Sequence, residues 1–97
     1  MSLTLEDNQL KEVRSILESI VPGISVWAFG SRVTGRAKPF SDLDLALVSA
    51  NPVSKDTLWD LQESFSESEL PFRVDIIDLA VAPPEIKAAV ERNNIPL

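Results

Sequence analysis

Apolar residues recur at helical spacing near the start of the chain. The repeating positions are Leu10, Val13, Leu17 and Ile20, with Ile16 widening the stripe. Thr4 can cap this helix, with Asp7 three residues further on, and Pro22-Gly23 ends it. The pattern therefore predicts an amphipathic helix that packs one face against a core.

Three short runs rich in β-forming residues follow, each bounded by a turn signal. They are Ile24 to Phe29, Leu43 to Val48, and Phe72 to Leu79. Gly30 closes the first run, Asn51-Pro52 ends the second, and Pro71 precedes the third. These runs predict three strands.

Two further helices are expected between and after these strands. Ser54 can cap the first, whose buried stripe is Leu58, Leu61 and Phe65. Pro83-Pro84-Glu85 opens the last helix, in which we expect Ile86, Ala89 and Val90 to face inward. With a short helical turn at Ser31, the order is α-β-α-β-α-β-α. We expect one α/β domain over residues 1–97, with a small mixed sheet and helices packed mainly on one face.

The composition of the chain limits which metals it could bind and which residues could act as a general base. The chain has 97 residues, no cysteine, no histidine and a formal net charge of −6. A metal site must therefore use oxygen ligands, which favours Mg²⁺ or Mn²⁺ over Zn²⁺, and any general base must be a carboxylate. The acidic balance argues against an extended nucleic-acid surface. With no signal peptide and no apolar run long enough for a bilayer, we expect a cytoplasmic protein that does not bind membranes.

Three aspartates are the candidate catalytic and metal-binding residues. Asp42 directly precedes the predicted strand Leu43 to Val48 and Asp44 lies in it; because they are two residues apart in an extended segment, both carboxylates project from the same side. Carboxylates this close repel each other unless a cation compensates them. Asp75, inside a later apolar strand, is the expected third ligand and proton acceptor. Asp78 is the competitor, but it faces the other way and more plausibly caps the strand end.

A phosphate-binding turn is predicted before the first acidic pair. In Gly30-Ser31, glycine lets the backbone approach a ligand and the following amides and hydroxyl can face phosphate oxygens. Gly35 is expected to supply a left-handed or close-approach position, and Ser41 to hold the start of the next strand. The pattern does not decide which loop cation reaches a phosphate; the candidates are Arg32, Arg36 and Lys38.

Each of these features also has a plain structural reading. The acidic pair could lie on a solvated edge strand, Gly30-Ser31 could be an ordinary turn, and the loop cations could simply be solvated. Trp27 and Trp59 fit core or interface packing better than stacking on a base.

The combination of Gly30-Ser31, ten intervening residues, Asp42-x-Asp44 and a later strand aspartate resembles the DNA polymerase beta-type nucleotidyltransferases. The minimal nucleotidyltransferases are the most similar group. The resemblance implies that Asp42, Asp44 and Asp75 bind two Mg²⁺ ions, and that Gly30 and Ser31, with Arg32, Gly35 and Ser41 nearby, hold a nucleotide. ATP is the implied substrate.

Many minimal members act as the antitoxin of a HEPN-domain toxin, and some transfer AMP to a tyrosine of that toxin. The resemblance therefore implies a HEPN-domain partner. Two other functions stay open: an antitoxin that neutralises its partner by occlusion alone, and an aminoglycoside-type nucleotidyltransferase. A homodimer or hetero-oligomer is plausible for so small a domain, through Trp27, Trp59 or the C-terminal helix.

Overall fold

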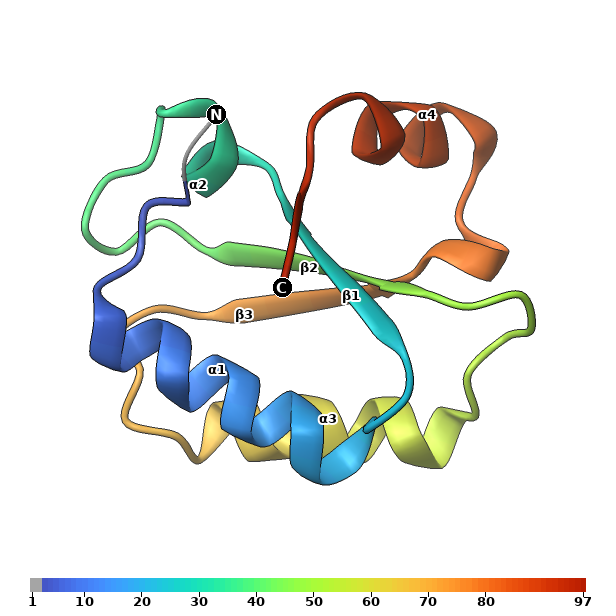
Figure 1. Ribbon diagram of the computed structural model, residues 1–97, viewed down its shortest axis with the longest axis horizontal. Helices are drawn as coiled ribbons and strands as arrows, with labels where there is room; N and C mark the ends of the chain where they lie inside the picture. The colour runs from blue at the N-terminus through green and yellow to red at the C-terminus, as the bar shows by residue number, and fades with distance from the viewer. Residues whose placement is uncertain (1–2) are drawn as a thin grey trace.

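A four-stranded mixed sheet forms the centre of the molecule (Figure 1). The computed structural model describes residues 3–97. The strands are β1 (Ser25–Phe29), β2 (Leu43–Val48), β3 (Val74–Asp78) and β4 (Ile95–Pro96), in the spatial order β3-β2-β1-β4. β1 pairs antiparallel with β2 and β4, whereas β2 and β3 run parallel. The predicted mixed sheet is confirmed, with β4 as an additional edge strand.

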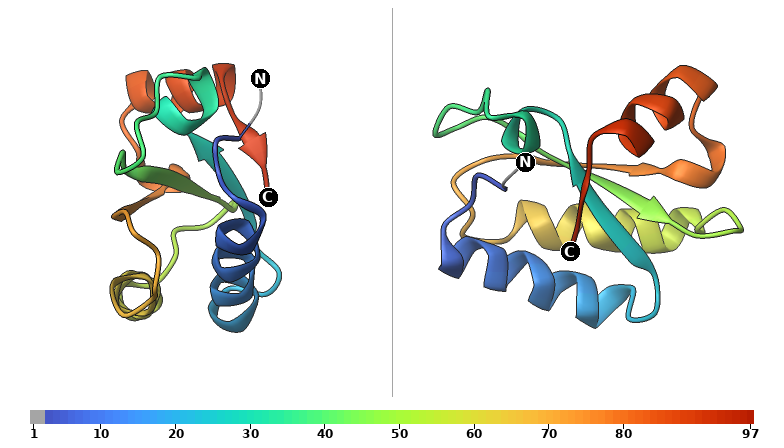
Figure 2. Two further views of the ribbon diagram at one scale, coloured as in Figure 1. Left: turned by 90° about the vertical axis from the view of Figure 1, so that its left-hand side faces the viewer. Right: turned by 45° about the horizontal axis from the view of Figure 1, so that its top comes forward.

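The two long helices, α1 (Asp7–Ile20) and α3 (Lys55–Ser66), cover one face of this sheet. Figure 2 shows them side by side on that face. Apart from Leu10, their predicted stripes pack into a core with alternate residues of β2. Ile16, Ile20 and Leu58 are partly buried there, and the buried side chains are Val13, Leu17, Leu61, Phe65, Leu43, Leu45 and Leu47. Since alternate strand residues face opposite sides, the even-numbered residues of β2 are left for the other face.

A second, smaller apolar cluster occupies that other face. Ala46, Leu79 and Val90 are buried there, and the partly buried Trp27 packs against them, which agrees with the core alternative of its predicted core or interface packing. Trp59, by contrast, is 69% exposed on α3 and is not a core residue.

The last helix, α4 (Pro84–Arg92), contributes only one buried residue. The prediction that Ile86 and Ala89 face inward is wrong, because both are exposed. The helix joins the second cluster through Val90, so the neighbouring part of its surface stays in solvent.

Several element boundaries also differ from the sequence pattern. α1 is capped by Glu6, whose backbone N–H donates to Gln9 Oε1 at 3.0 Å, and not by Thr4. The third strand ends at Asp78, after which Leu79–Val81 form a short 3-10 helix, η1.

Among residues 3–97, no helix combines the length and the apolar character that crossing a bilayer would require.

Candidate active site

A glycine turn connects β1 to the short helix α2 (Ser31–Thr34) and lies against an aspartate. Gly30 has φ 81° and ψ −155°, a conformation that is essentially restricted to glycine. A Cβ atom at Gly30 would collide with the carboxylate of Asp44, whose Cγ would be 3.2 Å away. The predicted close-approach glycine therefore brings the backbone of this turn directly onto an acidic side chain.

Asp44 is the central residue of the site. In the sheet register it lies between Phe29 of β1 and Asp75 of β3, so both aspartates occupy neighbouring positions on the same face. Asp42 precedes β2 and is exposed. The Leu43 N–H donates to Arg73 O at 2.9 Å and holds the start of β2 beside the segment that leads into β3.

The electrostatics of Asp44 reflect these neighbours. Burial raises the pKa of Asp44, and the negative charges of Asp75 and then Asp42 raise it further. The three predicted acids are thus close enough for two of them to disfavour ionisation of the third. A cation bound among them would remove this repulsion.

The carboxylate oxygens of these residues are ligands that suit Mg²⁺ or Mn²⁺, and Asp44 and Asp75 face the same side of the sheet. Within residues 3–97, no three acidic side chains stand close enough together to hold one ion. Asp75 Oδ1 instead accepts a 3.0 Å ion pair from Arg73, a residue two positions earlier on the same side of the strand. This ion pair involves one of the two carboxylate oxygens of Asp75.

Arg32 was a candidate for contact with a nucleotide phosphate, but its side chain is buried. Its side chain is 4% exposed, and its three nitrogens donate to the backbone carbonyls of Ser41, Thr4 and Pro39 at 3.0, 2.8 and 3.0 Å. The guanidinium also lies 4.1 Å from the centroid of the Phe72 ring. Burial lowers the pKa of Arg32, and the charge of Asp42 opposes that shift. This arrangement contradicts a phosphate contact by Arg32. Its hydrogen bonds instead hold the N-terminal segment at Thr4 against the loop at Pro39 and Ser41.

The rest of the loop is arranged by short-range contacts. Gly35 adopts the left-handed conformation, φ 83°, at the end of α2, as predicted. Ser41 Oγ accepts from the backbone N–H of Lys38 at 2.8 Å, which fixes the turn before Asp42. The side chains of Arg36 and Lys38 are exposed. Nucleotide contacts by Ser31, Gly35 and Ser41 remain predictions.

Asp78 is a structural cap, as expected. Its carboxylate accepts from the N–H of Val53 at 2.7 Å and from the N–H of Ala80 at 3.1 Å, and the residue is 7% exposed. It begins η1 and fastens the loop after β2. Both carboxylate oxygens are occupied, so Asp78 does not compete with Asp75.

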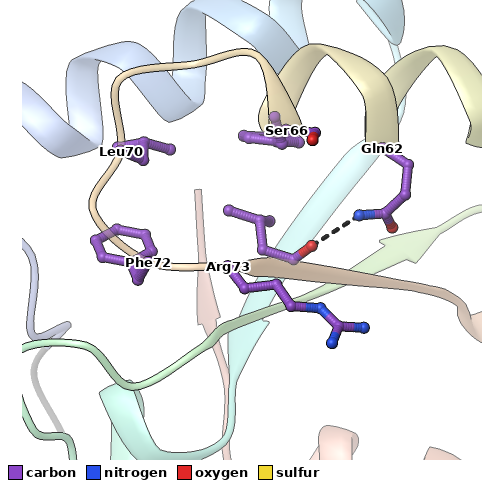
Figure 3. A pocket seen from close by; sticks show the side chains of 7 residues that line it. Gln62, Ser66, Leu70, Phe72 and Arg73 are labelled. Atoms are coloured by element: carbon purple, nitrogen blue, oxygen red, sulfur yellow. Dashed lines mark hydrogen bonds between the residues drawn. The ribbon is translucent and has the colours of Figure 1, made fainter.

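A cavity of about 370 Å³ lies between α3 and β3, away from the aspartates (Figure 3). Gln62 on its wall donates to Val74 O at 2.8 Å, which satisfies a carbonyl at the outer edge of the sheet. Val74 faces the helices and Asp75 the opposite side, so this cavity is not part of the candidate active site.

Sequence reasoning missed two contacts of the site. The first is the Arg73–Asp75 ion pair, for which the two-residue spacing on a strand was an available signal. The second is the stacking of Arg32 on Phe72, which joins segments forty residues apart and leaves no local pattern.

Comparison with known proteins agrees with this geometry. The family described as polymerase beta nucleotidyltransferase matches residues 10–97. A probable protein adenylyltransferase, MntA, from Haemophilus influenzae is 43% identical over 90 residues, which is 93% of this chain and 79% of that protein.

Two solved structures share the fold. A toxin–antitoxin complex with AMP-PNP has a TM-score of 0.75 at 24% identity, covering 89% of this chain and 69% of the other. A complex of tri-AMPylated Shewanella oneidensis HEPN toxin with its MNT antitoxin has a TM-score of 0.66 at 24% identity, covering 91% and 69%. The glycine turn, the aspartates on one face and the extent of these matches place the chain in the polymerase beta-type nucleotidyltransferase family.

Proposed function

We propose that this protein transfers AMP from ATP to a hydroxyl of a HEPN-domain protein, in a Mg²⁺-dependent reaction, and so acts as the antitoxin of that protein. The observation that carries the proposal is the contact between the Gly30 turn and Asp44, with Asp75 in register beside it. The adenylyltransferase name of the H. influenzae relative and the AMPylated toxin bound to a structural neighbour support the substrate and the partner. The site of action would be the cytoplasm.

The residues have separable roles in this reaction. Asp42, Asp44 and Asp75 would hold two Mg²⁺ ions, which supply positive charge to the attacking and leaving oxygens. The amides that follow Gly30 and the Ser31 hydroxyl would hold the triphosphate.

The transfer itself exchanges one phosphorus–oxygen bond for another. The acceptor oxygen bonds to the α-phosphorus, the bond from that phosphorus to the β-phosphate breaks, and pyrophosphate leaves. Asp75 would take the proton from the acceptor hydroxyl, because the chain has no histidine to serve as the base.

The Arg73–Asp75 ion pair favours a second candidate function, neutralisation by occlusion. In that case Asp75 would remain paired with Arg73 and the protein would inhibit its partner by covering it. Asp44→Asn distinguishes the two functions, because occlusion survives the change and transfer does not. Affinity for the partner is measured beside activity.

The test of the proposed function follows AMP itself. The protein is incubated with Mg²⁺, ATP labelled on the α-phosphate, and a HEPN-domain toxin, and label on the toxin is measured. We expect Asp42→Ala and Asp44→Ala each to lower transfer by a factor of about 100 or more. Asp60→Ala, which changes an exposed acid of α3, is the control and should leave transfer unchanged. Label transfer that persists in both active-site variants would refute the assignment.

A further inference from the structure

Phe40 is the most exposed large apolar side chain among the described residues. It is 76% exposed, and it lies two residues before Asp42 in the loop that leads into β2. Exposure of a single apolar residue is ordinary. What distinguishes Phe40 is its position beside the candidate active site, on a loop that is firmly held.

Arg32 holds the backbone on both sides of Phe40. Its Nε donates to Ser41 O and its NH2 group donates to Pro39 O, each at 3.0 Å. The turn is fixed again where Ser41 Oγ accepts from the Lys38 N–H. With both flanking carbonyls directed at one buried guanidinium, the Phe40 side chain is presented outward on an ordered backbone. A loop whose backbone is ordered before binding loses less entropy when a partner covers it.

The loop belongs to the β3 side of the site. The Arg32 guanidinium that anchors it lies over Phe72, just before β3, and Leu43 bonds to the carbonyl of Arg73. This is the strand that carries Asp75, the proposed proton acceptor. The phosphate-binding turn at Gly30 follows β1, which pairs with the opposite edge of β2.

We propose that Phe40 is the docking residue for the acceptor-bearing segment of the protein partner and determines acceptor specificity. The inference rests on the proposed function, since it concerns the hydroxyl that receives AMP. Phe40 enters an apolar pocket on the partner and brings the acceptor hydroxyl to the Asp75 side of the site.

A protein partner suits Phe40 better than the adenine base does. With 76% of its surface exposed, the Phe40 ring protrudes from the loop and does not form the wall of an enclosed base pocket. Protruding aromatic side chains that fill a pocket of the other molecule are typical anchors of protein–protein interfaces.

The test separates partner binding from nucleotide binding. Wild type and Phe40→Ala are compared for KM of a HEPN-domain toxin in AMP transfer, for Kd of the same toxin without ATP, and for Kd of Mg·AMP-PNP without toxin. We expect Phe40→Ala to raise both toxin constants about tenfold or more. The AMP-PNP constant and kcat at saturating toxin should stay within about twofold. Phe40→Leu should recover part of the loss, because it restores apolar bulk.

Val81→Ala is the matched control, because Val81 is also an exposed apolar residue but lies on η1, beyond the far end of β3. It should leave all three constants unchanged, and an equal effect from Val81→Ala would overturn the inference. A rise confined to the AMP-PNP constant would also overturn it and would assign Phe40 to the base. A wild-type protein that binds toxin but transfers no AMP would refute the proposed function alone, and the toxin Kd would still decide the role of Phe40.

Discussion

Three features of its surroundings disfavour ionisation of the Asp44 carboxyl group. It is half-buried, it has Asp75 beside it in the sheet, and it feels the charge of Asp42. Each influence disfavours the ionised carboxylate, and nothing in the described residues forms an ion pair with it. A half-buried carboxyl with two acidic neighbours is a group that a bound cation would stabilise.

The first prediction concerns stability and pH. Because the pKa of Asp44 is raised in the folded state, the folded protein holds this proton more tightly than the unfolded chain does, and ionisation above that pKa destabilises the fold. Asp44→Asn should therefore raise the Tm at pH 7 without Mg²⁺. The gain should shrink as the pH falls and vanish below about pH 4, where Asp44 is protonated in both states. A lower Tm for the variant at pH 7 would contradict this account.

The second prediction concerns the glycine turn. Gly30→Ala should cost about 1–3 kcal/mol of unfolding free energy from backbone strain and should also lower AMP transfer, because the new Cβ displaces the Asp44 carboxylate. Gly23→Ala, in the turn before β1 and outside the candidate site, is the control: its φ is also positive, but nothing beyond its own turn lies within 4 Å of the added Cβ. It should cost about 1–2 kcal/mol and leave transfer intact after correction for folded protein. Urea unfolding and the labelled-ATP assay measure the two effects, and equal losses of transfer would refute the proposed contact.

The residues of the site differ in how far sequence could place them. Asp42 and Asp44 could be assigned to one side, because residues two apart in an extended segment project the same way. The position of Asp75 beside Asp44 depends on the pairing of β2 with β3, which only the fold supplies. The role of Arg32 could not be read, since a cation after a glycine turn has the same pattern whether it binds a phosphate or backbone carbonyls. Its acceptors come from the N-terminal segment and the following loop, which only the fold brings together.

Helices and strands with a strong periodic pattern of apolar residues could be predicted from the sequence, whereas short elements without such a pattern could not. α1, α3 and the three main strands follow from their apolar spacing. β4 has only two residues, Ile95–Pro96, and it forms because β1 offers a free edge for pairing. No pattern in the local sequence could have predicted it. The burial predicted for Ile86 failed for a related reason: short α4 offers an apolar stripe, but the sheet covers only part of it.

The connection from β2 to α3 gives the third prediction. Asp78→Ala would leave the amides of Val53 and Ala80 without their acceptor and should lower the unfolding free energy by about 2–3 kcal/mol. Asp75→Ala should remove AMP transfer with a much smaller loss of stability, because its one ion pair is with the exposed Arg73. Urea denaturation beside the transfer assay distinguishes the cap from the catalytic group. A large stability loss in Asp75→Ala together with a small one in Asp78→Ala would reverse the two roles.

In the whole molecule, the site lies at one end of the sheet, at the beginning of β2 and β3 and the end of β1. Figure 1 shows α2 and the loop that follows it at this end, while α1 and α3 support the opposite face. The core therefore fixes the positions of Asp44 and Asp75 on β2 and β3, while Asp42 directly precedes β2.

The most direct test of this account is a Mn²⁺ titration in the presence of AMP-PNP, followed by electron paramagnetic resonance. Mn²⁺ replaces Mg²⁺ at oxygen sites and is visible to the method. The wild-type protein should bind about two ions. The combined Asp42→Asn, Asp44→Asn and Asp75→Asn variant should bind them at least about 100-fold more weakly while it still folds. Equal Mn²⁺ affinity in the two proteins would contradict the claim that these three carboxylates form the metal site.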